Sequence, residues 1–328
     1  MANKVLNWGL LSTARINRAL ITPLRASNRN QLAAVASRTQ ESADQYAREW
    51  QIARAHSSYE ALLADPEIDV IYNSLPNRFH AEWTIKAVEA GKHVLCEKPL
   101  ALNTDEVDAV QAAARKHGRV VMEAFMYRHH PQTLKVLELV KSGSLGTVKL
   151  VRGSFSFFLS REGDVRLDPA LGGGSIWDIG CYPINYTRSI LGENPLEVFG
   201  WQVTGPTGID ETFVGQLRFD HDVYTQFDCS FAIPLRWSME IAGSEATLNI
   251  PSPFKPGLDE KIYLTRGDQT ETINIPGQEL YIGEVENMAD AILLGKEPRI
   301  SLEDSRANVN VITSLLESAR VGKPISFR

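Results

Sequence analysis

Short apolar runs alternate with amphipathic stretches along the first third of the chain. The apolar runs predict strands, and the stretches between them predict helices. The strands are expected at residues 5–11, 31–36, 70–73, 93–97 and 119–123, and the helices at residues 16–25, 41–50, 59–63, 79–90 and 104–117. Parallel strands joined by crossover helices produce this alternation. We therefore expect an α/β domain of the Rossmann type, with a doubly wound parallel sheet, at residues 1–124.

The pattern changes after this segment. Helices are expected at residues 131–142, 175–191, 284–294 and 302–321, and a long strand at 148–159. Between about residues 197 and 275 come several strand-like runs separated by short turns, namely residues 212–219, 224–231, 238–242, 247–250, 261–265 and 270–275. Consecutive strands with short turns favour antiparallel pairing. We expect an α+β domain at residues 125–328 with a large, mostly antiparallel open sheet.

Composition narrows the class of protein. A chain of 328 residues is long enough for two domains. The net charge of -6 and the absence of a Lys/Arg block argue against nucleic acid and anionic membranes as partners. No apolar run approaches the roughly 18–20 residues of a membrane helix, and no signal-peptide pattern is present.

The three cysteines are Cys96, Cys181 and Cys229. Their wide spacing indicates reduced thiols, so a cytoplasmic protein is expected. No His, Cys or carboxylate cluster has metal-ligand spacing, so no metal is expected.

The first expected strand runs into a turn of small residues that precedes a helix. The pattern is Gly-x-x-Ser-x-Ala, and its candidate cofactor contacts are Gly9, Ser12, Thr13, Ala14, Arg15 and Ile16. Small residues let a diphosphate approach backbone N–H groups at a helix N-terminus. An ordinary strand-to-helix turn explains the pattern equally well, but the alternation that follows favours a cofactor site.

The second expected strand ends in Ser37, Arg38 and Thr39. A site that prefers NAD usually carries Asp or Glu here, for the ribose 2′-hydroxyl. These three residues supply donors that suit a 2′-phosphate. We therefore expect NADP as cofactor, with a solvated surface arginine as the alternative for Arg38.

Four segments together resemble the Gfo/Idh/MocA oxidoreductase family, the relatives of glucose-fructose oxidoreductase and inositol dehydrogenase. They are Glu97-Lys98-Pro99 after a strand, residues 74–80, residues 123–131 and residues 172–182. The resemblance covers essentially the whole chain. Within the family, three segments are similar to the branch of dimeric dihydrodiol dehydrogenase and NADP-dependent D-xylose 1-dehydrogenase. They are the turn at residues 11–16, Ser37-Arg38 and Gly180-Cys181-Tyr182.

The resemblance implies hydride transfer between a nicotinamide and a C–OH or C=O group of a sugar or cyclic diol. A D-xylose-like aldose is the first substrate expected. Reduction of a keto-sugar and oxidation of a trans-dihydrodiol are alternatives, and a non-catalytic NADP-binding sensor is an alternative of another class. A homodimer formed through the open sheet is expected.

The expected catalytic residues are Lys98, Asp178 and Tyr182. Asp178 and Tyr182 are four residues apart, so a helix places them on one face. We expect Tyr182 to transfer the substrate proton, Lys98 to stabilise the phenolate, and Asp178 to orient the substrate or pair with Lys98. Two alternatives stay open. Lys98 is the acid/base in one, and Asp178 only completes a capping box with Ser175 in the other. Many relatives carry His in place of Tyr182.

The other candidates are assigned by position. Ser74, Leu75, Asn77, His80, Glu97, Lys98 and Arg166 are expected on the cofactor side, and Tyr127, Arg128, His130, Asp178 and Tyr182 on the substrate side. For His80 the alternative is a helix cap, and for Arg166 a surface ion pair. For Arg128 and His130 the alternative is hydrogen bonding at the domain junction.

Overall fold

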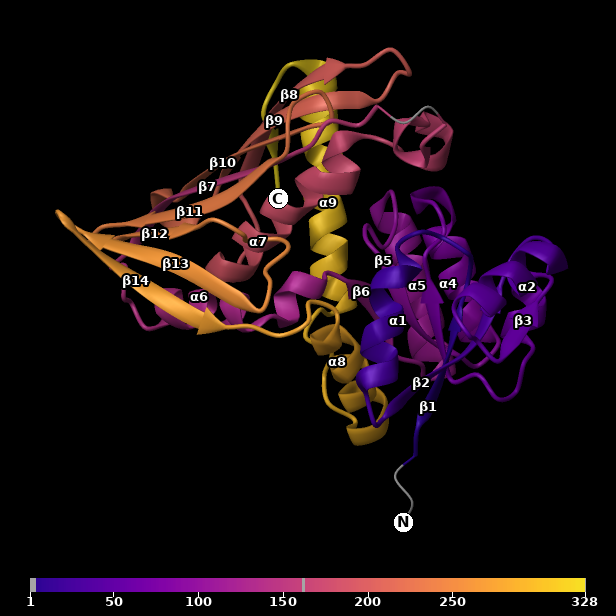
Figure 1. The fold of residues 1–328 in the computed structure, drawn as a ribbon. Helices are drawn as coiled ribbons and strands as arrows, with labels where there is room; N and C mark the ends of the chain where they lie inside the picture. The colour runs from indigo at the N-terminus through magenta and orange to yellow at the C-terminus, as the bar shows by residue number, and fades with distance from the viewer. Residues whose placement is uncertain (1–3, 161–162, 328) are drawn as a thin grey trace. The chain divides into compact units, whose positions relative to one another are not determined.

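The computed structural model describes residues 4–160 and 163–327 (Figure 1). The chain divides into two compact units, Met1–His129 with Tyr281–Arg306 and His130–Leu280 with Ala307–Arg328. The division after His129 lies close to the predicted boundary after residue 124. The sequence-based division differs in assigning Tyr281–Arg306 to the second domain, because it followed chain order alone.

The first unit contains a six-stranded sheet with the order β3-β2-β1-β4-β5-β6. Every pairing in it is parallel, which confirms the doubly wound sheet. The strands are β1 (Leu6–Leu10), β2 (Asn30–Ala36), β3 (Arg54–His56), β4 (Val70–Asn73), β5 (His93–Glu97) and β6 (Val121–Ala124). The helices are α1 (Asn17–Ala26), α2 (Gln40–Glu49), α3 (Tyr59–Leu63), α4 (His80–Glu89), α5 (Thr104–His117) and α8 (Ile282–Leu294).

Local sequence explains where these helices begin and end. Asn103 caps α5 by accepting a hydrogen bond from the Glu106 N–H at 2.8 Å. Gly118 ends the same helix in the left-handed conformation, with φ of 61°, which glycine adopts without a Cβ clash. The start and stop signals therefore lie where the pattern placed this helix.

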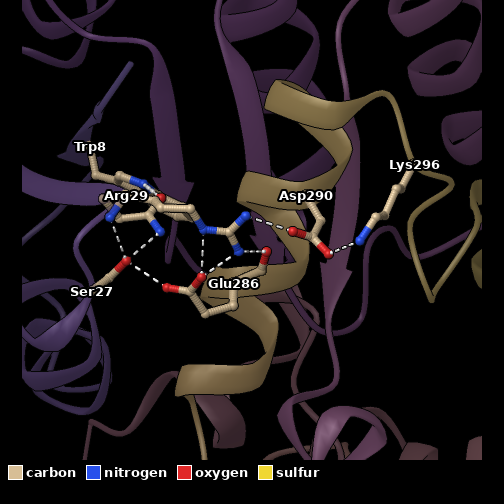
Figure 2. A network of polar contacts seen from close by, with 7 residues as sticks. Trp8, Ser27, Arg29, Glu286, Asp290 and Lys296 are labelled. Atoms are coloured by element: carbon tan, nitrogen blue, oxygen red, sulfur yellow. Dashed lines mark hydrogen bonds and ion pairs between the residues drawn. The ribbon is translucent and has the colours of Figure 1, made fainter. Parts of the chain in front are cut away.

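The returning helix α8 is fixed to the first unit by a polar network around Arg29 (Figure 2). Helix α8 packs against α1 and β2. The Arg29 guanidinium donates to Glu286 through Nε at 2.8 Å and to Asp290 through Nη1 at 2.6 Å. Ser27 donates to Glu286 as well, and Lys296 donates to Asp290 at 2.8 Å. Charge-assisted bonds of this kind are stronger than neutral ones, so they account for the position of residues 281–306.

The second unit contains a nine-stranded sheet with the order β14-β13-β12-β11-β7-β10-β9-β8-β15. Its pairings are antiparallel except for β7 with β10, which are parallel. The strands are β7 (Val148–Ser156), β8 (Glu197–Thr204), β9 (Asp210–Arg218), β10 (Tyr224–Ser230), β11 (Arg236–Gly243), β12 (Thr247–Ile250), β13 (Asp259–Arg266), β14 (Gln269–Pro276) and β15 (Ile325–Ser326). The predicted large, mostly antiparallel sheet is confirmed.

Helices cover this sheet. Helix α7 (Cys181–Leu191) packs against β7 and β10, and α6 (Pro131–Lys141) packs against α7 and β14. Helix α9 (Leu302–Val321) runs on from the first unit, and Ser318 accepts a bond from the Gly200 N–H of β8 at 3.1 Å. A Cβ on Gly153 of β7 would lie 2.7 Å from Pro183, so glycine at that position lets α7 lie directly on the sheet. Within residues 4–160 and 163–327, no helix is long and apolar enough to cross a membrane.

The three cysteines are buried, and none of them forms a disulfide within the part of the chain that the structure describes. Burial raises the pKa of the Cys96 and Cys229 thiols. Both therefore remain protonated near neutral pH and pack as small apolar groups.

A buried carboxyl group anchors the segment that precedes α7. This segment is a π-helical turn, Ile176–Gly180. Asp210 of β9 accepts hydrogen bonds from the Ser175 hydroxyl at 2.8 Å and from the Ile176 N–H at 2.7 Å. Gly174 has φ of 133°, and a Cβ there would lie 2.2 Å from the Asp210 carboxylate. Glycine at 174 therefore provides the space that Asp210 needs.

We predict that Asp210 makes the stability of the fold depend on pH. Burial raises the pKa of its carboxyl from 3.8 to about 6, although the bonds from Ile176 and Ser175 act in the opposite direction. Between these values the folded chain retains a proton that the unfolded chain has lost, so the free energy of unfolding falls as pH rises. The Asp210→Asn variant keeps an acceptor oxygen but cannot titrate. Relative to this variant, the wild type should lose on the order of 2–3 kcal/mol between pH 4 and 7.

Urea denaturation of both proteins at each pH unit measures this difference. The two proteins share every other titrating group, so the contributions of those groups to the pH dependence cancel in the comparison. A difference that stays constant from pH 4 to 7 would contradict the prediction.

Candidate active site

Ser12 organises the turn between β1 and α1. Its hydroxyl lies 2.8 Å from the Ser74 hydroxyl and accepts the Ala14 N–H at 3.0 Å. Its carbonyl accepts the Asn17 side-chain amide at 2.7 Å. Helix α1 starts without a side-chain cap and without an acidic residue in its first turn. The positive end of the helix dipole is therefore suited to an anion such as a diphosphate.

The other candidates of this turn differ in exposure. Thr13, Ala14 and Ile16 are half-buried, and Arg15 is exposed. Gly9 lies within β1 and is buried. A Cβ on Gly9 would lie 2.9 Å from Leu62. Glycine at position 9 therefore lets α3 pack against the sheet. This packing role of Gly9 was not predicted from the sequence.

The end of β2 presents one unpaired charge. Ser37 is buried, and its N–H bonds to the His56 carbonyl at 3.1 Å. Thr39 caps α2 by accepting the Ser42 N–H at 3.2 Å. Arg38 is exposed, and within the described residues its side chain makes no hydrogen bond or ion pair. Burial raises the pKa of Tyr59, and the charge of Arg38 offsets part of that rise, which places the guanidinium near this ring.

Lys98 follows the last residue of β5 and is half-buried. The Lys98–Pro99 peptide bond is cis. Glu97 accepts a hydrogen bond from the buried Tyr72 hydroxyl, and its other oxygen accepts the Lys98 N–H at 3.3 Å. Burial raises the pKa of Tyr72 well above its usual range, and the charge of Glu97 adds to the rise. Tyr72 therefore stays protonated as the donor to Glu97.

Two further side chains hold residues 98–100, which we call the lysine loop. His80 Nδ1 lies 2.6 Å from the Pro99 carbonyl oxygen. Glu123 of β6 accepts the Leu100 N–H at 2.8 Å. The backbone of the lysine loop is thus bonded at three consecutive residues to side chains of β5, α4 and β6. This holds the base of the Lys98 side chain in place.

The loop after β4, residues 74–79, carries the remaining candidates of the first unit and is called the β4 loop. Ser74 is buried against Ser12. Asn77 is half-buried and begins a short 3-10 turn. Leu75 is buried, and its carbonyl lies 2.6 Å from His80 Nε2. His80 is the first residue of α4, and both of its ring nitrogens face carbonyl oxygens rather than a helix N–H, so the alternative of a helix cap is wrong.

In the second unit, Asp178 lies within the π-helical turn and is half-buried. Arg166 is near it, with Nη1 3.7 Å from the Asp178 carboxylate, and Arg166 Nε lies 3.1 Å from Asp164. The ion-pair alternative for Arg166 is therefore what the structure shows. Its partner is a predicted catalytic residue, so Arg166 compensates the charge that Asp178 would bring to a substrate.

The capping-box alternative for Asp178 is wrong. Ser175 directs its hydroxyl to Asp210 rather than to the helix N-terminus, and it makes no capping bond. The Asp178 N–H bonds to the Gly174 carbonyl at 3.1 Å. Asp178 is thus not required for a reciprocal cap.

Tyr182 is the second residue of α7 and is 5% exposed. Its ring centroid lies 5.4 Å from that of Phe155 and 5.6 Å from that of Phe254. Aromatic contacts of this kind hold a phenol ring in one orientation. Phe155 of β7 therefore packs against a candidate catalytic ring.

The junction residues have structural partners. Tyr127 is fully buried, and Arg128 pairs with Asp304 at 3.1 Å in the first unit. His130, in the second unit, is fully buried and caps α6 by accepting the Gln132 N–H at 3.1 Å. Its Nε2 lies 3.1 Å from the Gly257 carbonyl. The Arg128 bond lies within the first unit and the His130 bonds within the second, so substrate contact and hydrogen bonding at the domain junction both stay predictions for these residues.

The structure therefore brings the predicted residues together in two groups. The first unit collects the β1 turn, the β4 loop, Arg38 and the lysine loop at the carboxyl ends of its parallel strands. The second unit collects Arg166, Asp178 and Tyr182. Sequence reasoning missed the supporting residues Tyr72, Glu123 and Asp210, because no local motif marks them and their partners are distant in the sequence.

Known proteins resemble the chain over both units. A model described as an oxidoreductase family with an NAD-binding Rossmann fold matches residues 6–125, and the GFO/IDH/MocA C-terminal domain model matches residues 133–249. The chain is 36% identical over 325 residues to D-xylose 1-dehydrogenase (NADP(+)) 2 of Haloferax volcanii, covering 98% of this chain and 99% of that one. It is 36% identical over 251 residues to trans-1,2-dihydrobenzene-1,2-diol dehydrogenase of Danio rerio, covering 75% of each.

A solved structure agrees with these matches. A 3-ketoreductase from Actinomadura kijaniata in complex with NADP and TDP-benzene matches with a TM-score of 0.91 at 28% identity, covering 96% of this chain and 98% of that one. Both family models match in chain order, and a relative at 36% identity spans nearly the whole chain. The chain therefore belongs to the Gfo/Idh/MocA oxidoreductase family.

Proposed function

We propose that this oxidoreductase transfers a hydride between NADP(H) and a C–OH or C=O group of a sugar or cyclic diol. A D-xylose-like aldopyranose, oxidised at C1 to a lactone, is the first substrate we propose. The observation that carries the proposal is the lysine loop, which holds Lys98 at the carboxyl end of β5 through three backbone bonds. Ligands of open parallel sheets bind at the carboxyl ends of the strands.

The relatives support this choice of substrate class. A relative that covers 98% of this chain and 99% of its own length is named as a D-xylose 1-dehydrogenase. The alternatives also have support. The 3-ketoreductase favours reduction of a keto-sugar, and the dihydrobenzenediol dehydrogenase favours oxidation of a trans-dihydrodiol. All three reactions exchange a hydride and a proton at one carbon–oxygen bond.

The residues of the first unit fit NADP. The uncapped start of α1 and the turn held by Ser12 suit a diphosphate. Arg38 lies at the end of the second strand with an uncommitted charge, and Ser37 precedes it. A guanidinium binds a phosphate through two parallel bonds, so Arg38 would bind the 2′-phosphate.

When bound, the nicotinamide accepts or donates the hydride, and the protein must move the proton of the substrate oxygen. We assign that transfer to the Tyr182 phenol. Lys98 would lower the free energy of the phenolate and hold the substrate oxygen. Asp178, charge-compensated by Arg166, would orient a neighbouring hydroxyl. The alternative gives proton transfer to Lys98 and orientation to Tyr182. In a non-catalytic sensor, the same residues would bind NADP and a sugar without turnover.

A homodimer through the sheet of the second unit is part of the proposal. One face of β8 carries Phe199, Trp201 and Val203. Val214 of the neighbouring strand β9 lies opposite Trp201. Trp201 is 54% exposed and Val203 59%. Exposed apolar groups on adjacent strands are typical of interfaces. Sedimentation velocity at micromolar concentration tests this, and a sole monomer species would contradict it.

The first test is turnover. One assay combines NADP with a panel of pentoses, hexoses and cyclic diols, and a second combines NADPH with keto-sugars. In the first assay, the absorbance of reduced nicotinamide should rise when an aldopentose is added. Tight NADP binding with no turnover across the panel would instead support the sensor. Reduction of a keto-sugar alone would select that alternative.

Tyr182→Phe separates the two assignments of the proton. Loss of a general acid/base lowers kcat by roughly 10²–10⁴-fold, while NADP affinity should be unchanged. The matched control is Tyr186→Phe, because Tyr186 lies one turn further along α7, is fully buried and also contacts Phe254. If Tyr182→Phe turned over at near wild-type rates, proton transfer would be assigned to Lys98 instead.

Arg38→Ala tests the choice of cofactor. Removal of a charge-assisted phosphate contact, about 1.5–3 kcal/mol, should raise the Kd for NADP by roughly 10–150-fold. The Kd for NAD should change little, because NAD lacks the 2′-phosphate. Arg48→Ala, an exposed arginine on α2, is the control. Equal losses for both cofactors in fluorescence titrations would show that Arg38 does not bind the 2′-phosphate.

A further inference from the structure

We propose that Asp210 is a positioning residue that fixes where Asp178 lies relative to Tyr182. The inference rests on the proposed roles of Asp178 and Tyr182 in the reaction. Asp210 lies on β9, is 5% exposed, and binds the two residues that begin the helical segment rather than Asp178 itself. It acts on the substrate only through the segment that it holds.

The Asp210 carboxyl group fixes the start of this segment. One of its oxygens, Oδ2, accepts both the Ser175 hydroxyl at 2.8 Å and the Ile176 N–H at 2.7 Å. The backbone of Asp210 is anchored in the nine-stranded sheet, where it lies opposite Thr204 of β8. Ile176 is fully buried. Without the carboxyl group its N–H would lose this acceptor, which costs free energy unless the segment moves.

Packing on the sheet fixes the other end of the segment. Helix α7 packs against β7 and β10, and a Cβ on Gly153 of β7 would lie 2.7 Å from Pro183. The Tyr182 ring contacts the rings of Phe155 and Phe254. These contacts do not involve Asp210, so Tyr182 should keep its place when the start of the segment moves.

Between the two fixed ends, Ile176–Gly180 winds as a π-helical turn. Such a turn contains more residues than an α-helical turn and is rare, so it needs a restraint from outside the segment. A released start could rewind as α-helix, and a shift by one residue would turn it by about 100° and move it by about 1.5 Å relative to α7. Asp178 is the middle residue of the turn, so its side chain would change direction while Tyr182 stays.

The same movement would disturb the ion pair of Asp178. Gly174, directly before Ser175, donates its N–H to the Arg166 carbonyl at 3.0 Å. The Arg166 guanidinium lies 3.7 Å from the Asp178 carboxylate. Both partners of the pair are therefore placed by backbone next to the bonds of Asp210. A displacement of about 1 Å in a catalytic group can lower a rate by about 100-fold.

The test is a double-mutant cycle between positions 210 and 178. Asp210→Ala should lower kcat by roughly 10–100-fold, because Asp178 is misplaced. The Kd for NADP should not change, since the residues that fit NADP lie in the first unit. In the Asp178→Ala background the same substitution should lower kcat by less than about threefold, because no carboxylate remains to be misplaced. Equal losses in the two backgrounds would overturn the inference.

Asp210→Asn is the conservative variant. Both bonds end on Oδ2, so one amide oxygen in that position can accept both. This variant should therefore keep kcat within about threefold of the wild type. A loss as large as that of Asp210→Ala would show that the two hydrogen bonds are not what positions Asp178.

Leu217→Ala is the control for lost stability. Leu217 lies near the other end of β9 and is 1% exposed. Its truncation should lower the unfolding midpoint, because it leaves a cavity in the same unit, but kcat should not change below that midpoint. If kcat fell as far as in Asp210→Ala, destabilisation of the second unit would explain both variants and the inference would fail.

A crystal structure of Asp210→Ala provides a measurement that does not depend on turnover. The π-helical winding of Ile176–Gly180 should be lost and Asp178 should move away from Arg166, while the Tyr182 ring stays against Phe155. An unchanged turn would contradict the inference even if kcat fell. If the wild type turned over no sugar or diol, the proposed function would fail, and this structure would still decide whether Asp210 places Asp178.

Ser175→Ala takes the place of Asp210→Ala if that variant does not fold. It removes one of the two bonds to Oδ2 and leaves the other. Loss of one hydrogen bond should lower kcat by roughly 2–10-fold, and this loss should disappear in the Asp178→Ala background. A wild-type kcat in Ser175→Ala, or the same loss in both backgrounds, would count against the inference.

Discussion

The backbone of a parallel sheet loses its hydrogen-bond partners where the strands end, and the candidate site depends on how this chain replaces them. Beyond β4 and β5, peptide groups must bond to side chains, because an unpaired buried group costs free energy. Glu97, His80 and Glu123 each bond to one residue of the lysine loop. The groups that satisfy the backbone are thus the groups that fix Lys98. Stability and positioning are achieved here by the same contacts.

This constraint explains which parts of the site were predictable. Local patterns mark three parts of the site: the phosphate turn, the Glu-Lys-Pro segment and the helix with Asp178 and Tyr182. The limits of two strands, Val70–Asn73 and His93–Glu97, were also predicted as the structure has them. These two strands are buried on both faces, so they are recognised as short continuous apolar runs. The supports Tyr72, Glu123 and Asp210 carry no local pattern. Their partners are 25, 23 and 35 residues away in sequence, so only folding identifies them.

The same reasoning applies to errors of assignment. Ser175 and Asp178 have capping-box spacing, but Asp210 takes the Ser175 hydroxyl and the segment winds as a π-helical turn. In a cap the Ser175 hydroxyl would accept a helix N–H, but here it donates to a distant carboxyl group. The ring of His80 likewise faces carbonyl oxygens rather than a helix N–H. Tyr281–Arg306 was placed by chain order, whereas Arg29, Glu286 and Asp290 bind it to the first unit. Local propensity is a weak predictor wherever a buried charge offers a stronger partner.

The division of the chain also separates the chemistry into two kinds of element. The first unit holds Lys98 and the residues that fit a dinucleotide, all on loops anchored to a parallel sheet. The second unit holds Tyr182 on a helix, with its ring packed against Phe155 and Phe254. A cofactor shared by a whole family requires constant geometry, which the anchored loops supply. Substrates that differ within it require a variable surface, and a separate unit can change its side chains without disturbing the lysine loop.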